Sequence, residues 1–482
     1  MRRAAVFAAV LCCICGCSDS ARQDQSDSTL GTGGMAGTLP ANGTGGSAVV
    51  PATGSGGAGA MPATAMDAST GMPEIEAGID AGLGDAMAGI DAMMPDGGAP
   101  DADGAIDSGP PMFGANVRIN DDNGSAQQVE VMIAARPDGL VLAGWVDSRN
   151  GTQCAYAVSK DGGATWGKNF LVGSLSAGGF TGDPSVAVDD AGNLYAVCQD
   201  YGSTKRILFA WSSDSGDTWT QWTGINSSQD KPWIAAARDG TVFLTWLGSP
   251  GGYKRSLDHG QTWENPISLG NLVHGTGIAP ATTGLVHIAY NQSSQVHYVR
   301  SDDWGETLDM GRDLVNQGTA CFEPCSPRSH PIIGTATDPT GQFVAITWAS
   351  TMPGGDGDDD VWVIVSQDGG DTFSDPIRVN DNTQPSRQFQ PWVAVDRHKR
   401  VHVVWTDLRN NGQNATYYAR MDDPAQGFGP NIEVTDARGN PPSFMGDYKA
   451  VAIQGDDVLV AWCDSRNGNG DIYFARAPGA AR

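Results

Sequence analysis

Apolar residues recur along the chain as short strands separated by glycine-containing turns. From residue 130 onward, each unit has an apolar strand, a turn and a second apolar strand, as in "PSVAVDDAGNLYAVC" and "PWVAVDRHKRVHVVW". The residues that end the second strands lie 44 to 58 positions apart and are Trp145, Cys198, Trp246, Tyr290, Trp348, Trp405 and Trp462. Four short strands fit in each interval, which is the content of one propeller blade. The pattern predicts an all-β, seven-bladed β-propeller, with a six-bladed ring as the alternative.

In five units a third strand runs into a turn of the form S-x-D-x-G-x-T followed by a large apolar residue. The five copies are "SKDGGATW" at 159, "SSDSGDTW" at 212, "SLDHGQTW" at 256, "SDDWGETL" at 301 and "SQDGGDTF" at 366. In such a turn the Asp accepts hydrogen bonds from its own backbone, the Gly permits positive φ, and the aromatic ring packs between strands. These repeats resemble the Asp-box of the bacterial neuraminidase repeat proteins, and the resemblance covers residues 113–482. It implies a sialidase-superfamily propeller whose Asp-boxes lie opposite the active face.

The last unit ends at "DIYFARAP" with only three strands. A fourth is available at the front, because "FGANVRIN" at 113 matches "FSDPIRVN" at 373 and "FGPNIEVT" at 428. We therefore expect the amino-terminal strand to complete the last blade. This closure removes the edges that an open ring would expose and makes the first and last blades neighbours.

The candidate functional residues fall in four neighbouring blades. The string W-x-D-x-R ends the second strand of blades 1, 6 and 7, and so points to the face without Asp-boxes. Its polar members are Asp147 and Arg149, Asp407 and Arg409, and Asp464 and Arg466. The residues before the first strands of blades 1, 2, 6 and 7 are Glu130, Asp183, Gln390 and Asp447. Blades 6, 7, 1 and 2 should therefore carry most of the chemistry.

The resemblance to sialidases implies roles for these residues. In that family three arginines hold a sugar carboxylate, a Tyr activated by a Glu is the nucleophile, and an Asp is the acid. Carried over by role, Arg149, Arg409 and Arg466 form the clamp, with Arg387, Arg438 or Lys449 as possible replacements for one member. Tyr448 is then the nucleophile beside Glu130, and Asp447 or Asp183 is the acid.

Two departures keep a second function open. The F/Y-R-I-P motif of sialidases is missing, since "VRIN" supplies Arg118 without a Pro. Each candidate arginine also lies two residues from an Asp, and a local salt bridge that holds the loop explains this spacing equally well. The sequence is thus consistent with glycan recognition and exo-sialidase-type hydrolysis, or with a non-catalytic scaffold that binds a protein or a polysaccharide.

The first seventeen residues, "MRRAAVFAAVLCCICGC", have a positively charged start, an apolar run and a small residue before Cys17. They resemble a lipoprotein signal in which Cys17 is lipidated, which implies a bacterial outer-membrane or surface location and membrane contact only through the anchor. The alternative is a signal cleaved to release the protein. Residues 18–112 are rich in Gly, Ala, Asp, Thr and Pro, and predict a disordered tether.

The net charge, the His and Asp residues and the cysteines give further expectations about partners, metal ions and disulfides. The net charge of −26 argues against nucleic acid. No cofactor is expected, because the seven His residues show no paired zinc spacing and the acidic loop "GGDGDDD" fits a solvated loop better than a Ca²⁺ site at Asp356, Asp358 and Asp360. Cys321 and Cys325 are predicted to form a small-loop disulfide, and Cys198 is predicted to be a small core residue.

Overall fold

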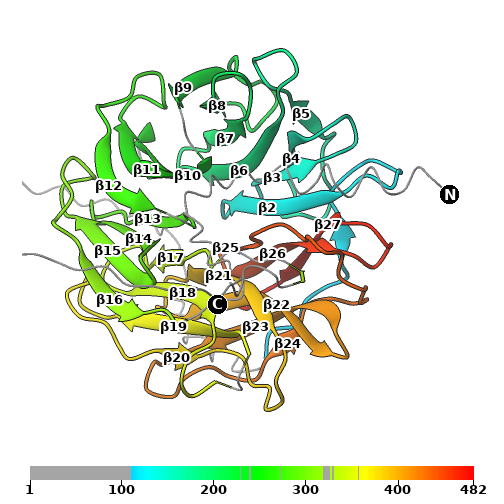
Figure 1. Cartoon of the computed structure of the whole chain (residues 1–482), viewed down its shortest axis with the longest axis vertical. Helices are drawn as coiled ribbons and strands as arrows, with labels where there is room; N and C mark the ends of the chain where they lie inside the picture. The colour runs from blue at the N-terminus through cyan, green and yellow to red at the C-terminus, as the bar shows by residue number, and fades with distance from the viewer. Residues whose placement is uncertain are drawn as a thin grey trace, which may run out of the picture. The chain divides into compact units, whose positions relative to one another are not determined.

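The computed structural model describes residues 110–227, 230–237, 240–272, 274–318, 326–327, 331–355 and 358–482. These residues form seven antiparallel sheets arranged around a central axis, so the prediction of a seven-bladed all-β propeller is confirmed (Figure 1). The predicted signal peptide, the lipidation site Cys17 and the predicted tether up to residue 109 lie outside the described residues. Within the described residues, no helix is long and apolar enough to cross a membrane.

Each blade is a meander whose first strand lies nearest the axis. Blade 1 holds β2 (Gln128–Ala135), β3 (Val141–Asp147), β4 (Gln153–Ser159) and β5 (Phe170–Val172). Blade 2 holds β6 (Thr181–Val188), β7 (Leu194–Asp200), β8 (Arg206–Ser212) and β9 (Thr223–Ser227). Blade 3 holds β10 (Asp230–Ala236), the long β11 (Val242–Ser256) and β12 (Ile267–Leu272). Blade 4 holds β13 (Thr276–Pro280), β14 (Val286–Gln292), β15 (Gln295–Ser301) and β16 (Arg312–Asn316).

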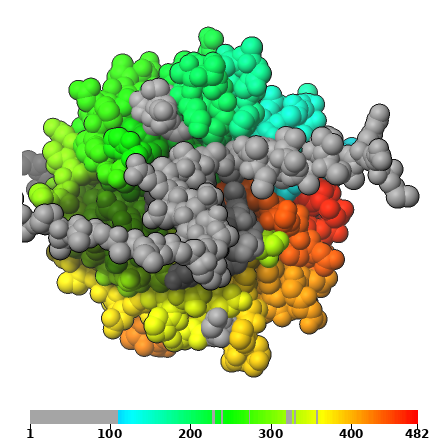
Figure 2. Space-filling model, viewed as in Figure 1, coloured from blue at the N-terminus to red at the C-terminus, as the bar shows by residue number. Residues whose placement is uncertain are grey.

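The remaining blades complete the ring. Blade 5 holds β17 (Gly334–Thr337), β18 (Val344–Ser350), β19 (Asp360–Ser366) and β20 (Ile377–Arg378). Blade 6 holds β21 (Gln388–Val395), β22 (Val401–Asn410), β23 (Gln413–Met421) and β24 (Ile432–Glu433). Blade 7 holds β25 (Ala450–Gln454), β26 (Asp457–Asp464), β27 (Asp471–Ala477) and β1 (Val117–Arg118). Figure 2 shows the blades following one another around the disc in chain order.

The ring closes as the sequence predicts. Strand β1 pairs antiparallel with β27, with Val117 opposite Phe474 and Arg118 opposite Tyr473. The amino-terminal strand thus becomes the outer strand of the last blade, and blades 7 and 1 are neighbours. The residues that end the second strands, from Trp145 to Trp462, are all buried at no more than 4% exposure, so they form the packing layer between blades.

A disulfide that the sequence did not reveal joins blades 1 and 2. Cys154 on β4 is bonded to Cys198 on β7, at a sequence separation of 44 residues. The expectation that Cys198 is only a small core residue is therefore wrong. Pairing depends on two strands of neighbouring blades coming into contact, which no local spacing reports. Cys463 is a buried free thiol, and the predicted pair Cys321 and Cys325 lies outside the described residues.

The five S-x-D-x-G-x-T turns share one hydrogen-bond pattern. In the first, Asp161 accepts hydrogen bonds from the backbone N and the hydroxyl of Thr165 at 2.8 and 2.5 Å, while the Ser159 hydroxyl accepts from the Gly163 N at 2.9 Å. Gly163 has φ of +88°, and a Cβ there would lie 2.1 Å from the ring of Phe474 in the preceding blade. Each turn therefore both closes its own hairpin and fits against the neighbouring blade.

Candidate functional site at the channel mouth

The first strands of blades 1, 2, 3 and 6 share one irregularity near their starts. Their pairing with the second strand shifts register at the same place, and the residue within the shift has positive φ. These residues are Glu130 (61°), Asp183 (49°), Lys231 (42°) and Gln390 (56°). Positive φ is uncommon outside glycine, and a bulge redirects the side chain that it carries. The chain thus uses a repeated bulge to direct polar groups at the inner end of four blades.

Lys231 connects three blades across the ring. Its Nζ lies 3.0 Å from Oδ1 of Asp183 in blade 2 and 2.8 Å from Oδ2 of Asp447 in blade 7. All three side chains are no more than 7% exposed. Because blades 3 and 7 are not adjacent, these contacts can only meet at the central channel. Charges so far removed from water must be paired, and here one ammonium neutralises part of the charge of two carboxylates.

Tyr201 extends this group toward the surface. It follows Asp200 at the end of β7, and its hydroxyl lies between the carboxylates of Asp183 and Asp230, hydrogen-bonded to both and 2.6 Å from Oδ1 of Asp230. Its ring stacks on Phe180 with centroids 4.8 Å apart, and the side chain is half-buried. We refer to Asp183, Tyr201, Asp230, Lys231 and Asp447 as the channel-mouth cluster.

The surroundings of the cluster favour the protonated form of the Tyr201 phenol and make the Asp230 carboxylate a stronger proton acceptor. Burial, together with the charges of Asp183 and Asp230, raises the pKa of Tyr201 well above its ordinary value. Burial and the neighbouring Asp183 also raise the pKa of Asp230. His274, in the segment before β13, has its pKa lowered to about 4 by burial and by Lys231, against the opposing charge of Asp447. His274 is therefore neutral at pH 7 and places an uncharged ring beside the cluster.

Tyr448 belongs to an aromatic layer in the channel. Its ring centroid is 5.0 Å from that of Trp233, which in turn lies 5.1 Å from Trp392, so blades 3, 6 and 7 meet there. The Tyr448 hydroxyl donates to the carbonyl of Pro184 at 3.1 Å and the residue is 1% exposed. Burial and the charge of Glu130 raise the pKa of Tyr448 well above its ordinary value. In this structure the Tyr448 hydroxyl is therefore bonded to a backbone carbonyl and not to a carboxylate, and its role as nucleophile stays a prediction.

Each of the three candidate arginines forms a salt bridge with the aspartate two residues before it. Nη2 of Arg149, Arg409 and Arg466 is 2.8 Å from a carboxylate oxygen of Asp147, Asp407 and Asp464, respectively. The backbone N of each arginine donates to the same carboxylate at 2.8 Å, and the indole N–H of the preceding Trp donates to it at 2.8 to 3.2 Å. These three aspartates are almost fully buried, so they close the loop after the second strand rather than face a ligand.

Each of these arginines also reaches the preceding blade. Arg409 contacts Asp381, which follows the outer strand of blade 5, at 2.6 Å, and donates to Asn431, which precedes its own outer strand, at 2.9 Å. Arg149 repeats the arrangement with Asp121 and Asn169, and Arg466 repeats it with Asp436 and Asn116. We call this Asp–Arg–Asp–Asn set the outer latch. The three guanidinium groups share no partner among the described residues, since each is held by the carboxylates of its own latch.

The possible replacements for the clamp are engaged elsewhere. Arg387 donates to the Pro327 carbonyl at 2.8 Å and lies 3.4 Å from Asp359, with its guanidinium over the Phe389 ring. Arg438 is paired with Glu433, and Lys449 is buried with its Nζ 2.9 Å from the hydroxyl of Thr416. None of these contacts brings a further cation to the channel-mouth cluster.

The acidic loop does not form a metal site in the described part of the chain. Asp360 is paired with Arg378 at 2.5 Å and with the Asn380 amide at 2.6 Å, so its carboxylate is already used. Asp356 lies outside the described residues. Among the residues that are described, no group of three His, Cys, Asp or Glu side chains is arranged to hold a metal ion.

Sequence reasoning located Asp183, Asp447 and Glu130 at the inner end of their blades but missed Lys231, Tyr201, Asp230 and His274. Blade 3 lacks the W-x-D-x-R string, so that string does not predict functional residues in this blade. A usable signal was present, because "KPW" at 231 aligns with "QPW" at 390 and "DPS" at 183. That alignment assigns Lys231 the same inner position as Asp183 and Gln390.

No family model and no curated protein matches the chain. Solved structures give distant matches. The Hadza microbial sialidase Hz136 is 17% identical, with a TM-score of 0.40 over 58% of this chain and 63% of the sialidase. An α-L-arabinanase of Penicillium chrysogenum, solved with arabinobiose, is 13% identical, with a TM-score of 0.42 over 76% of this chain and 98% of its own. The phage phi92 endosialidase is 10% identical, with a TM-score of 0.46 over 76% and 69%. At these values the matches assign no activity to this chain.

Proposed function

We propose that this protein is a glycan-recognising propeller and that a sugar binds at the channel-mouth cluster. The observation that carries the proposal is the meeting of Asp183, Lys231 and Asp447 from three blades, with Tyr201 and Asp230 at the half-buried edge. Carboxylates accept hydrogen bonds from sugar hydroxyls, an ammonium donates to them, and an aromatic ring packs on the apolar face of a pyranose. The cluster supplies all three kinds of group.

The charge of the cluster favours a neutral glycan over sialic acid. The cluster itself holds three carboxylates, Asp183, Asp230 and Asp447, and one ammonium, Lys231. A sugar carboxylate brought there would meet like charge, which costs free energy in a water-poor site. The proposal therefore retains a sialidase-like propeller and changes the class of sugar.

A second candidate function is hydrolysis of a glycosidic bond. The observation in its favour is the Tyr201 hydroxyl between two carboxylates, one of which, Asp230, has a raised pKa. Asp230 can accept the phenol proton as Tyr201 attacks the anomeric carbon and the glycosidic C–O bond breaks, with the leaving oxygen taking a proton from water. Water activated by Asp230 then attacks the glycosyl-tyrosine, which releases the sugar and restores the phenol, while Asp183, held by Lys231, lies beside the reacting carbon. The tyrosine and carboxylate roles of the resemblance would then pass from Tyr448 and Glu130 to Tyr201 and Asp230. Asp447, bonded to Lys231, would act as a binding group.

We also propose that the protein is exported and anchored to the bacterial surface through Cys17. The Cys154–Cys198 bond supports export, because disulfides persist in oxidising compartments. Metabolic labelling with an alkyne palmitate analogue tests the anchor. Wild-type protein should be labelled and Cys17→Ala should not, while labelling that survives in Cys17→Ala would contradict the assignment.

Calorimetry with the full chain tests the binding site. Neutral, amino and sialylated oligosaccharides are titrated into wild type, Asp230→Asn and Tyr201→Phe. We expect neutral glycans to bind and each substitution to weaken them at least tenfold, because each removes a hydrogen-bonding group from the cluster. Asp381→Asn, in the outer latch, is the matched control and should bind as wild type. Binding of sialylated glycans alone, or of none of the set, would overturn the proposal.

A panel of 4-methylumbelliferyl glycosides tests hydrolysis. If Tyr201 is the nucleophile, Tyr201→Phe abolishes fluorophore release whereas Tyr448→Phe retains it. Each change removes one hydroxyl, but only the Tyr201 hydroxyl contacts carboxylates. The reverse result would return the role to Tyr448. Glycan binding without any turnover would leave the protein a binding propeller.

A further inference from the structure

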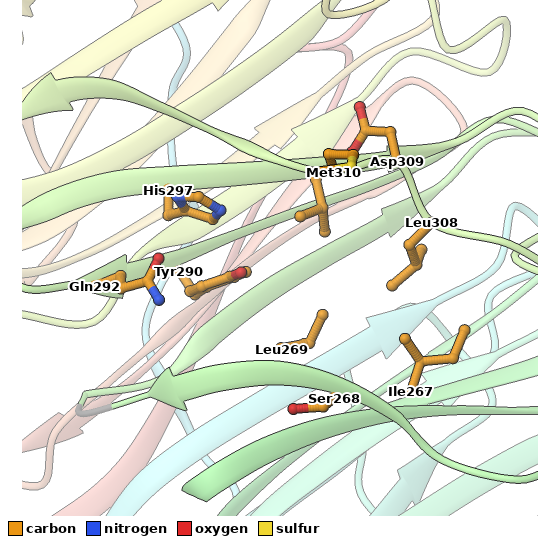
Figure 3. Close-up of a pocket in the computed structure, with 10 residues that line it drawn as sticks. Ile267, Ser268, Leu269, Tyr290, Gln292, His297, Leu308, Asp309 and Met310 are labelled. Atoms are coloured by element: carbon orange, nitrogen blue, oxygen red, sulfur yellow. The ribbon is translucent and has the colours of Figure 1, made fainter. Parts of the chain in front are cut away.

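A cavity of 350 Å³ lies between blades 3 and 4, away from the channel mouth. Its walls come from β12 of blade 3, from β14 and β15 of blade 4, and from the segment after the fourth S-x-D-x-G-x-T turn (Figure 3). Ile267, Leu269, Val299, Leu308 and Met310 supply apolar surface. Ser268, Tyr290, Gln292, His297 and Asp309 supply polar groups.

The cavity exists because one turn lacks its aromatic residue. In blade 2 the corresponding Trp219 packs on Phe170 at the start of the outer strand of blade 1, with centroids 5.4 Å apart. Trp166, Trp263 and Phe373 also pack on an aromatic ring of the preceding blade, at 5.4, 5.5 and 5.1 Å, but there the ring is on the third strand. In blade 4 this position is Leu308, and the facing position on β12 is Ile267. A single aliphatic side chain, Leu308, replaces the ring of the other turns, and the space between the blades stays open.

Tyr290 points a polar atom into this space. It ends the second strand of blade 4, where blades 1, 6 and 7 have a Trp whose indole bonds to an Asp. Tyr290 is 3% exposed, and its hydroxyl is directed toward the middle of the cavity, between His297 and Leu269 (Figure 3). Among the described residues, none hydrogen-bonds to this hydroxyl. The hydroxyl faces the open space of the cavity (Figure 3), so it is available to form a hydrogen bond with an occupant.

The surrounding groups define the chemistry of that occupant. The Tyr290 and His297 rings lie 5.0 Å apart, and His297 is fixed by Asp313 at 2.7 Å. Asp309 uses Oδ1 to accept from the backbone N of Arg300 and Gly311, at 2.9 and 3.1 Å. Burial, and after it the charges of Asp313 and Asp309, raise the pKa of Tyr290 to about 12. These two carboxylates lie beside the cavity, where a bound anion would meet like charge. An anionic ligand is therefore disfavoured, whereas a ligand with both an apolar face and hydroxyls is suited.

We propose that this groove, which we call the blade 3–4 groove, binds a neutral saccharide unit. The apolar face of the saccharide lies against Leu269 and Leu308, and the hydroxyls of the saccharide bond to Tyr290, Gln292 and Asp309. The volume falls at the lower end of the range of about 300–1,000 Å³ that is usual for small-molecule sites. The proposal stands on the groove alone and does not depend on binding at the channel mouth. If both sites are occupied, a polysaccharide can engage one molecule at two points.

The first test fills the groove. Leu308→Trp restores the aromatic residue of the other turns and should occupy the space without opening the blade. Neutral disaccharides such as cellobiose, maltose and xylobiose are titrated by saturation-transfer NMR into the full chain carrying Tyr201→Phe, which separates this site from the channel mouth. We expect Leu308→Trp to weaken binding at least tenfold while the melting temperature stays the same or rises. Phe373→Trp, the same type of change in blade 5, is the control and should bind as before.

The second test keeps the groove open and removes one hydroxyl. Tyr290→Phe should weaken the saccharide about fivefold or more, and it serves if Leu308→Trp does not fold. Neutral-saccharide binding that is unchanged in both variants would overturn the proposal, as would the absence of binding. Preference for sialyllactose or for an apolar peptide at this groove would overturn it too. Loss of binding at the channel mouth alone, with the groove still occupied, would contradict the proposed function and not this inference.

Discussion

Lys449 is a lysine enclosed in the protein interior, and it shows how a single residue can make stability depend on pH. It is 2% exposed and its Nζ bonds to the hydroxyl of Thr416. Burial lowers its pKa to about 7, against the opposing charges of Cys463, Asp464 and Asp407. The ordinary lysine value is 10.5, so between pH 7 and that value the unfolded chain binds more protons than the folded one.

We therefore expect the free energy of unfolding to rise with pH above about 7. From pH 7 to 8.5 the expected gain is about 1–2 kcal/mol. Lys449→Met should lose this dependence, because it has no proton to release on folding. Urea denaturation of both proteins at the two pH values measures the difference. The same rise in wild type and variant would assign it to another group.

The two tyrosines of the channel illustrate how environment decides a role. Tyr448 and Tyr201 are both buried phenols near the axis, and both have a pKa raised above the ordinary value. Only Tyr201 has carboxylates within hydrogen-bond distance, whereas Tyr448 bonds to a backbone carbonyl. Both are the same residue type close to an acidic residue of the inner blade ends, so the assignment of a role depends on the hydrogen-bond partner of each hydroxyl.

At the scale of elements, the outer latch explains the repeated W-x-D-x-R string. The Asp holds the loop and the indole of its own blade, and the Arg reaches the outer strand of the preceding blade. The cation also lies over an aromatic ring of its own blade, 4.4 Å from Tyr417 for Arg409 and 4.1 Å from Tyr473 for Arg466. Three copies tie blades 5 to 6, 6 to 7 and 7 to 1.

Removing one latch arginine should destabilise the protein without changing ligand affinity. Arg409→Met leaves the fully buried Asp407 without its cation, and we expect a loss of about 2–4 kcal/mol in the free energy of unfolding. Arg397→Met is the control, because the Arg397–Asp456 pair is about half exposed and should cost less than about 1 kcal/mol. Denaturant titration and glycan titration are measured together. Loss of glycan binding with unchanged stability would show that Arg409 serves a ligand.

The disulfide between blades 1 and 2 should contribute measurably to stability. It closes a loop at a separation of 44 residues, for which chain entropy gives about 4 kcal/mol. Reduction of wild type, or Cys154→Ser with Cys198→Ser, should lower the denaturation midpoint accordingly. Reductant added to the double variant is the control and should have no further effect. A midpoint of wild type that does not respond to reductant would contradict the bond.

At the scale of the whole molecule, the closing strand should decide whether the ring is a cooperative unit. Removal of residues 1–121 deletes β1 and leaves β27 as an open edge. We expect a lower melting temperature, a broader transition and self-association through that edge. Removal of residues 1–109 keeps β1 and is the matched control. Thermal unfolding and size-exclusion chromatography compare the two, and equal behaviour would mean that β1 is not required for closure.

The number of blades, their order and the closure by the amino-terminal strand could all be predicted from the pattern of residues along the chain. Blade number, blade order and closure can be predicted because they depend on local patterns. Alternating apolar residues, turn glycines and the spacing of the repeat are all present within one unit and its copies. The sequence also located the residues before the first strands of blades 1, 2, 6 and 7, among them Asp183, Asp447 and Glu130.

The tertiary structure alone decided which side chains meet. Lys231 and Asp447 are 216 residues apart and contact each other only because the ring brings blades 3 and 7 to one axis. The same is true of the Cys154–Cys198 bond and of the blade 3–4 groove, which depends on Leu308 facing Ile267 across two blades. The position of a residue in the repeat fixes its place within its own blade, but its contacts come from other blades. These contacts place the repeated arginines against the outer strands of neighbouring blades. They also bring Lys231 and Tyr201, which were outside the predicted set, to the carboxylates.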